Sequence, residues 1–394
     1  MVKSLSALLF IREGERLAEG SFWFLAAREE GLFGSGQGLI MEWMKVKKRI
    51  AVTDFLMWLI GAVILVFIIG GSIATISEGK YSARHWFDFI VFGLAQGSVY
   101  ALIAMGYTMV YGILRMINFA HSEVFMSGPY TAYFFAAYFH STGFLDRFPI
   151  FSLLVIFLVS MSTSTLIAVL LERVAYRPLR NAPRLIPLIT AIGASFFLQY
   201  TYRGLFGSGF QAYPVIKMLE GQILLGELRI LRFHAVVIIA AALVMLGLYL
   251  FVQRTKMGKA IRAVSEDKEA ASLMGIDMDR MIVTTFVIGG MAAGAAGVLY
   301  AIMYKQVHFF MGFIPGIKAF TAAVLGGIGN IPGAMLGGIF LGLIESIGPS
   351  LFLDGWGIIA PYQLKDAIAF TVLVLVLIFR PTGILGERLT VKKA

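Results

Sequence analysis

The chain has 394 residues, of which 59% are apolar and only 14% are charged. That balance is the reverse of the one in a soluble globular chain of this length, so the sequence predicts an integral membrane protein. The net charge of +10 does not indicate a nucleic-acid partner, because most lysines and arginines stand in short segments between apolar runs. The absence of cysteine excludes disulfides and thiolate metal sites, and the five histidines show no ligand spacing.

Residues 1–50 have mixed charges and aromatic side chains but no apolar run long enough to span a membrane. The glycine-rich stretch 34–38 is followed by the basic segment 44–49, which is typical of the start of a first membrane helix. This pattern favours translation that begins at Met41 or Met44. The alternative is an amphipathic extension that lies at the membrane surface.

Stretches of about 20 residues with few charges, enough to cross roughly 30 Å of hydrocarbon as α-helix, recur through the rest of the chain. We therefore predict an all-α, polytopic transmembrane helix bundle of about eight or nine spans. They lie near residues 55–77, 89–114, 124–139, 148–171, 185–202, 233–252, 281–304, 319–344 and 367–379.

Lysine and arginine are distributed unequally between alternate loops. The segments before the first span, at 173–184, at 254–280 and after residue 379 hold more than twice as many as the other loops. By the positive-inside rule this group is cytoplasmic, together with both termini. With both termini inside, the chain must cross the membrane an odd number of times after Tyr304. The apolar runs there would fit most simply as two long spans, which is an even number.

The stretch after Tyr304 is therefore expected to contain a broken or re-entrant helix. Irregular backbone survives at membrane depth only where protein buries it or where it lines a water-filled cavity, and discontinuous helices are where transporters bind substrate. The expected break is a run of helix-interrupting residues, namely Gly326, Gly327, Gly329, Pro332 and Gly333.

The segment 106–128 places Arg115, Asn118, His121 and Glu123 between two apolar stretches. An ionisable group at membrane depth costs roughly 2.5 to 3.5 kcal/mol on insertion scales, so it usually faces a cavity or a partner. The alternative is an ordinary cytoplasmic hairpin in which Arg115 and Glu123 mark the membrane interface.

The run 326–348 repeats glycine at a spacing of four residues. Small residues at this spacing let helices approach closely in lipid, so helix packing alone accounts for them. Lys318 and Glu345 bracket the run. Either residue could reach an interface by snorkelling instead of facing a pathway.

The loop 254–280 mixes apolar residues with charges, and Gly275 can end a helix or make a turn. A short amphipathic helix on the cytoplasmic side would bind either the membrane surface or another protein. The chain has no G-x-x-x-x-G-K-[ST] phosphate loop, so we expect no ATP binding of that kind.

Several segments share a pattern with a known family. They are GLAQGSVYAL at 93–102 with the tyrosine and glycine at 111–112, MINFAHSE at 116–123, ERVAYRPLR at 172–180, KAFTAAVLGGIGNIPGA at 318–334 and RPTGILG at 380–386. They resemble the branched-chain amino acid permeases of ATP-binding-cassette importers, from about residue 86 to the end. Ser122 stands where the family commonly has glycine, which adds a side chain at a position that we expect to be tightly packed.

The resemblance implies a coupling loop that docks on an ATPase subunit. Glu269, Ala270, Ala271 and Gly275 match the loop signature of importer permeases, which favours a protein partner over the membrane surface. The implied division is an extension at 1–50, a first membrane helix and outer loop at 51–85, a permease domain at 86–385 with its coupling loop at 253–280, and a tail at 386–394.

The resemblance also implies a transport subunit without catalytic residues, metal or cofactor of its own, since ATP binds to the partners. Those partners are a second permease, paralogous to this one, two ATPase subunits and an extracytoplasmic substrate-binding protein, in a bacterial or archaeal cytoplasmic membrane. Asn118 and Thr321 are expected to offer hydrogen bonds within the translocation pathway. The residues expected along the pathway are Tyr107, Tyr111, Asn118, His121, Glu123, Lys318, Thr321 and Glu345.

Three other functions are compatible with parts of this pattern. An importer of urea or short amides has permeases with the same general motifs. A passive channel would also contain re-entrant glycine-rich segments, although it needs no ATPase docking loop. An intramembrane enzyme is disfavoured, because no nucleophile and base occur at a plausible spacing.

Overall fold

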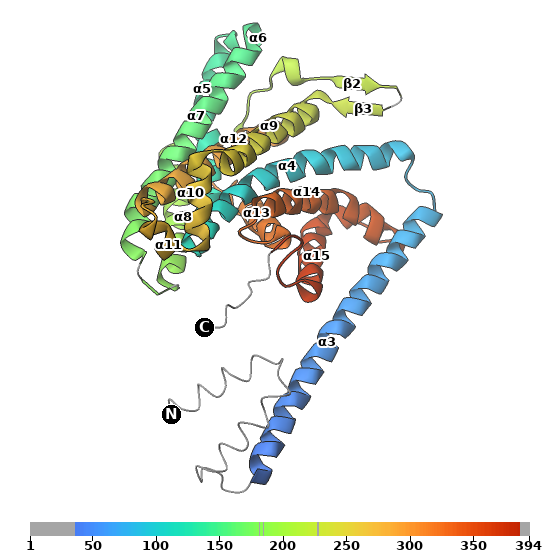
Figure 1. The fold of residues 1–394 in the computed structure, drawn as a ribbon. Helices are drawn as coiled ribbons and strands as arrows, with labels where there is room; N and C mark the ends of the chain where they lie inside the picture. Colours follow the sequence, from blue (N-terminus) through green and yellow to red (C-terminus); the bar gives the residue numbers. More distant parts are fainter. Residues whose placement is uncertain (1–35, 181, 184, 227, 387–394) are drawn as a thin grey trace. The chain divides into compact units, whose positions relative to one another are not determined.

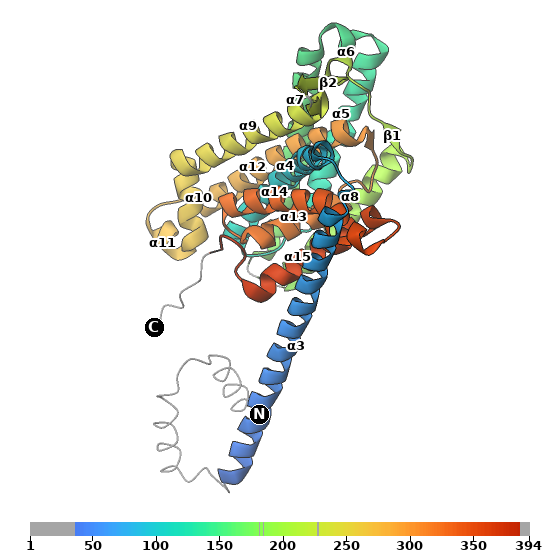
Figure 2. The same ribbon diagram turned by 90° about the vertical axis from the view of Figure 1, so that its right-hand side faces the viewer.

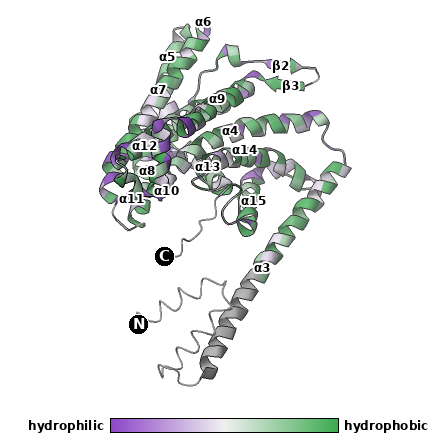
Figure 3. Cartoon of the chain, viewed as in Figure 1, coloured by the Kyte–Doolittle hydropathy of each residue, from purple (hydrophilic) through white to green (hydrophobic). Residues whose placement is uncertain are grey.

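The computed structural model describes residues 36–180, 182–183, 185–226 and 228–386, and these are mostly helical (Figure 1). Within this part, eight helical segments are long and apolar enough to cross a membrane. Figure 3 shows hydrophobic residues along most of their length. The predicted all-α polytopic bundle is confirmed. The segments are Phe55–Ser77, Ala83–Leu114, Pro149–Leu179, Leu185–Phe206, Arg232–Arg254, Met278–Tyr304, Ile331–Trp356 and Pro361–Phe379.

The described part of the chain consists of helices with four short strands, two of which form a hairpin in the long connection between α8 and α9. The longer helices are α3 (Gly36–Ser77), α4 (Ala83–Leu114), α5 (His121–Ser141), α7 (Pro149–Leu170), α8 (Leu185–Phe206), α9 (Arg232–Arg254), α10 (Lys256–Glu266), α12 (Met278–Tyr304), α13 (Phe313–Gly326), α14 (Ile331–Gly348) and α15 (Lys365–Phe379). The shorter ones are α6 (Phe144–Arg147), η1 (Leu171–Tyr176), η2 (Arg177–Leu179), η3 (Lys217–Leu219), α11 (Lys268–Leu273), η4 (Pro349–Leu353), η5 (Asp354–Trp356) and η6 (Pro361–Leu364). The strands β1 (Gln211–Ala212) and β4 (Gln306–Val307) pair antiparallel, as do β2 (Gln222–Leu225) and β3 (Leu228–Leu231).

The predicted span at 124–139 corresponds to α5, which is long enough to cross a membrane but is not among the eight apolar segments. Its first turn contains His121 and Glu123, and tyrosines follow, so its mean hydropathy is lower. The four short strands were not predicted, because runs of two to four residues carry too little of the alternating pattern to be recognised.

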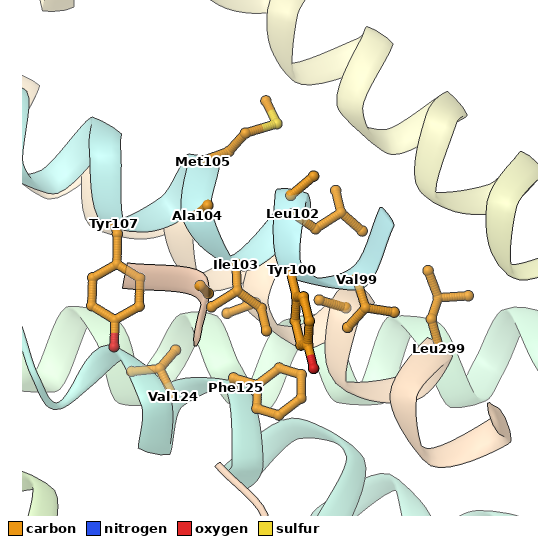
Figure 4. Packing of buried hydrophobic residues seen from close by; sticks show 14 of the residues in the cluster. Val99, Tyr100, Leu102, Ile103, Ala104, Met105, Tyr107, Val124, Phe125 and Leu299 are labelled. Atoms are coloured by element: carbon orange, nitrogen blue, oxygen red, sulfur yellow. The ribbon is translucent and has the colours of Figure 1, made fainter. Parts of the chain in front are cut away.

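Helices α4 and α12 form the core of the bundle, with 78% of each span buried against only 22% for α9. Figure 4 shows the large side chains of α4 packed against α5 and α12 around Tyr100, Phe125 and Leu299. On another face, α4 packs against α14 through glycine. A Cβ on Gly342 would come within 2.3 Å of the Gly97 Cα atom. The packing interpretation of the glycine run is therefore confirmed.

The predicted span at 319–344 is divided, as expected, into α13 and α14. Gly327 and Gly329 have φ of +107° and +97°, which only glycine adopts readily, and Asn330 caps α14 by accepting a hydrogen bond from the Gly333 amide (3.1 Å). After α15, the Leu385 amide donates to the Gly326 carbonyl (3.0 Å), which brings the chain back to this break. After Tyr304 the described residues thus contain two segments long enough to span a membrane, Ile331–Trp356 and Pro361–Phe379, preceded by the shorter apolar helix α13. The odd number of crossings stays a prediction.

Helix α3 begins at Gly36, well before the predicted start near residue 55. The chain divides into two compact units, residues 1–64 and 65–394. In the second unit the end of α3 packs on η4 and η5, where Phe67 stacks on Trp356 at 5.1 Å. Figure 2 shows the same unit from another side, with α13 beside α14 and α15. The predicted extension at 1–50 lies mostly outside the described residues, as does the tail after residue 386, and the start at Met41 or Met44 stays a prediction.

Candidate translocation pathway and coupling loop

Lys318 on α13 and Glu345 on α14 form a buried ion pair. The Lys318 Nζ atom lies 2.9 Å and 3.0 Å from the two carboxylate oxygens, and the side chains are only 4% and 1% exposed. Gln96 Nε2 (2.6 Å) and the Tyr100 hydroxyl (3.0 Å) on α4 donate to the same carboxylate, and Asp366 on α15 lies 2.7 Å from Lys318. This burial excludes snorkelling to an interface. We call these five residues the Glu345 cluster; they connect α4, α13, α14 and α15.

Glu123 lies at the start of α5 and is fully buried. Its Oε1 atom accepts hydrogen bonds from Gln199 Nε2 (2.7 Å) and Ser195 Oγ (3.2 Å) on α8, and from Ser122 Oγ (3.3 Å). Among the described residues no lysine or arginine forms an ion pair with Glu123, and its Oε2 atom has no hydrogen-bond partner. We call these four residues the Glu123 cluster. Its burial excludes the hairpin alternative for Glu123, whereas Arg115 is exposed.

Asn118 and His121 lie on either side of the turn into α5. The Tyr176 hydroxyl donates a hydrogen bond to Asn118 Oδ1 (2.5 Å), so the side chain of Asn118 is anchored to η1. The His121 ring packs edge-on against Tyr107, with centroids 4.8 Å apart, and lies over Gly106, where a Cβ would come within 2.3 Å of the ring. Both residues are thus held by α4 and η1.

Three of the expected residues line one small pocket between α4 and α13. Tyr107, Tyr111 and Asn118 share it with Phe320, Ala323 and Ile328. Thr321 is buried on α13. Six of the eight expected pathway residues therefore separate into this pocket, the Glu123 cluster and the Glu345 cluster, whereas His121 packs on Tyr107 and Thr321 is buried on α13 outside all three groups.

Ser122 occupies a tightly packed position, as predicted. A Cβ on Gly316 of α13 would come within 2.4 Å of the Ser122 Cβ, and one on Gly312 within 2.2 Å of the Ser122 carbonyl oxygen. The serine side chain is accommodated because α13 presents glycine to it.

The loop 254–280 folds as two short helices, α10 and α11, where one amphipathic helix was expected. Asp267 divides them, because its carboxylate caps α11 by accepting from the amides of Glu269 (2.9 Å) and Ala270 (3.0 Å). Gly275 ends α11 with φ of +79°, as predicted. Just before it, two large apolar side chains, Leu273 and Met274, are 89% and 82% exposed at the tip of the loop.

This loop is tied to the transmembrane helices at two points. Arg115, at the end of α4, donates to the Ser265 carbonyl in the last turn of α10 (2.6 Å). Arg177 and Arg180 both bond to Asp279 in the first turn of α12, and Arg180 also bonds to the buried Glu172.

The sequence prediction missed Tyr176, the partner of Asn118. It also missed the neutral and acidic partners of the two clusters, namely Gln96, Tyr100, Ser195, Gln199 and Asp366. Gln96 and Gln199 carry a recognisable signal, because an amide within an apolar span needs a buried partner. The hydroxyl groups carry no such signal, since serine and tyrosine are ordinary in membrane helices.

Comparison with known proteins gives a consistent result. Residues 89–377 match the family described as branched-chain amino acid transport system, permease component. The chain is 47% identical over 308 residues to the high-affinity branched-chain amino acid transport system permease protein BraD of Pseudomonas aeruginosa, covering 77% of this chain and 96% of that protein.

Two further relatives extend the comparison. The permease protein LivH of Escherichia coli is 45% identical over 302 residues, 75% of this chain and 94% of that protein. The probable branched-chain amino acid transport permease LivH of Methanocaldococcus jannaschii is 27% identical over 293 residues, 72% of this chain and 88% of that protein. No solved structure matches. The chain is therefore a multi-pass membrane transport subunit, not an enzyme, and it belongs to the family of permease components of branched-chain amino acid transport systems.

Proposed function

We propose that this chain forms the transmembrane path of an ATP-driven importer for leucine, isoleucine and valine. The similarity to BraD over 96% of that protein's length supports this substrate class. The proposed assembly contains a second, paralogous permease, two ATPase subunits and an extracytoplasmic substrate-binding protein. It lies in the bacterial or archaeal cytoplasmic membrane with both termini inside, as the distribution of lysine and arginine indicates.

The observation that supports coupling to ATP is the exposed tip of the loop α10–α11. Leu273 and Met274 stand almost free of the chain beside Glu269 and Gly275, which match the docking signature. An ATPase subunit would bury this tip. Movement of the tip would reach the transmembrane helices through Arg115 on α4 and Asp279 on α12. The chain itself would bind no ATP.

Within the bundle, we propose that Tyr107, Tyr111 and Asn118 contact the substrate when α4 and α13 move apart, because they line the small pocket between these helices, whose volume of about 10 Å³ is too small for an amino acid as it stands. His121, Glu123, Lys318, Thr321 and Glu345 would set the positions of the helices around this pocket. Alanine at Asn118 with normal expression and unchanged leucine uptake would remove Asn118 from the pathway.

The first experiment is uptake of labelled leucine by vesicles that contain the whole transporter, with and without ATP. The variant Leu273→Ser with Met274→Ser is compared with Leu224→Ser, a matched change at an exposed leucine on the β2–β3 hairpin. We expect ATP-dependent uptake, and loss of both uptake and ATPase co-purification in the double variant only. The more severe variant Glu269→Ala with Gly275→Pro should behave in the same way.

Two outcomes would contradict the proposal. Uptake that persists without ATP or without the loop would indicate a channel or a facilitator. Competition by urea but not by leucine would indicate an amide importer.

A further inference from the structure

A second pocket lies at the base of the loop α10–α11. It has a volume of about 350 Å³, is open on one side, and is lined by the end of α4, by η1 and η2, by the start of α8, by the start of α11 and by the start of α12. Its position connects the loop to three transmembrane helices. The residues that line it are Leu114, Arg115, Met116, Tyr176, Leu179, Arg180, Ala182, Pro187, Lys268, Met278 and Ile282.

The charged residues of this pocket are all positive. Arg115 gives a hydrogen bond to the neutral Ser265 carbonyl (2.6 Å), and Lys268 has no ion pair among the described residues. Arg180 bonds to Glu172 and Asp279, but its Nε–H group is buried without an acceptor. Partial burial, together with the positive charges of Arg115 and Arg180, lowers the pKa of Lys268, although its side chain still reaches solvent. The pocket thus gathers cations without enough carboxylate to balance them.

The remaining lining is apolar. Leu114, Leu179, Pro187 and Ile282 form its walls, and α8, which starts at this level, presents exposed apolar side chains such as Ile189 (67% exposed). A ligand that fits both features carries an anionic group at one end and hydrocarbon at the other. Basic pockets between transmembrane helices on the cytoplasmic side bind the headgroups of anionic lipids.

We propose that this pocket binds the phosphate headgroup of an anionic membrane phospholipid through Arg115, Arg180 and Lys268. The acyl chains lie along the apolar wall toward α8. A phosphate bridges the guanidinium of Arg115 at the end of α4 to Lys268, the first residue of α11. The bound lipid therefore fastens the coupling loop to the bundle.

A zwitterionic amino acid does not fit this pocket equally well, because its ammonium group would face three cations. The binding of lipid is independent of the proposed function. Only its effect on transport rests on the loop acting as the ATPase docking site.

The test measures binding of phosphatidylglycerol and of phosphatidylcholine with the same acyl chains to the purified, delipidated full chain, by native mass spectrometry. We expect preferential binding of phosphatidylglycerol. Each of Arg115→Gln and Lys268→Gln should weaken it about fivefold and the double variant roughly 25-fold, at about 1 kcal/mol for each cation. Lys259→Gln, which removes an exposed cation from α10 of the same loop, should leave it unchanged.

Competition with glycerol phosphate distinguishes the two sources of the anion. A lipid site is supported if glycerol phosphate displaces the lipid only at concentrations far above that of the bound phosphatidylglycerol. Equal affinity for glycerol phosphate would overturn it in favour of a small-anion site. Equal binding of phosphatidylcholine, or equal loss in Lys259→Gln, would also overturn it. None of these results depends on leucine uptake, so failure here is distinct from failure of the importer.

Discussion

The two buried carboxylates of the bundle, Glu123 and Glu345, are stabilised in different ways. Glu345 pairs with Lys318 and receives two further hydrogen bonds from α4. Glu123 receives hydrogen bonds only from an amide and two hydroxyl groups. Both carboxylates are about equally buried, so burial alone does not determine whether a cation or neutral groups stabilise them.

The difference lies in which helices each cluster joins. The Glu345 cluster connects the broken pair α13 and α14 to α4 and α15, where an ion pair can fasten a short helix that lacks a full membrane span of its own. The Glu123 cluster joins the start of α5 to α8. Helix α13 links the two, because it carries Lys318 and also packs through Gly316 on Ser122. Stability should therefore depend strongly on charge in one cluster and weakly in the other.

Lys318→Met tests the stronger cluster. Removing the cation leaves Glu345 buried with only Gln96 and Tyr100, and breaking a buried pair in this way costs about 3 to 5 kcal/mol. We expect the purified protein to lose that much free energy of unfolding, measured by denaturant or thermal unfolding in detergent.

The matched control for this change is the double variant Lys318→Met with Glu345→Met. It removes both charges while keeping the volume, and Gln96 and Tyr100 can still bond to each other (2.6 Å). The double variant should recover most of the free energy of unfolding that Lys318→Met loses. A double variant as unstable as the single one would show that packing, not charge, holds α13.

Gly316→Ala tests the link between the clusters. The new Cβ would meet the Ser122 Cβ at 2.4 Å, and overpacking of this kind costs about 1 to 3 kcal/mol. Adding Ser122→Gly should recover part of the loss. Gly193→Ala on α8 serves as the control, because the new Cβ would meet no neighbouring atom within 4 Å. This change should not destabilise the protein. Equal effects at Gly193 and Gly316 would contradict the tight contact.

Much of this arrangement follows from the sequence, and the part that does not has a physical reason. The apolar runs predict the spans, and the glycines at 326–333 predict the break, because both depend on local composition. The pairing of Lys318 with Glu345 could not be predicted, since the two residues meet only after α13 and α14 fold back on each other. Asp366 comes from a third helix, and nothing in its local sequence indicates Lys318 as its partner.

The smallest expected effect is that of Glu123→Gln. The glutamine oxygen can accept the hydrogen bonds from Gln199 and Ser195, and no cation among the described residues is left unpaired, so we expect a loss of less than about 1 kcal/mol. Glu345→Gln, measured in the same unfolding assay, should cost more, because it removes the charge opposite Lys318. If Glu123→Gln costs as much as Lys318→Met, the charge of Glu123 contributes to stability through its hydrogen bonds to Gln199 and Ser195, and the contrast between the two clusters does not hold.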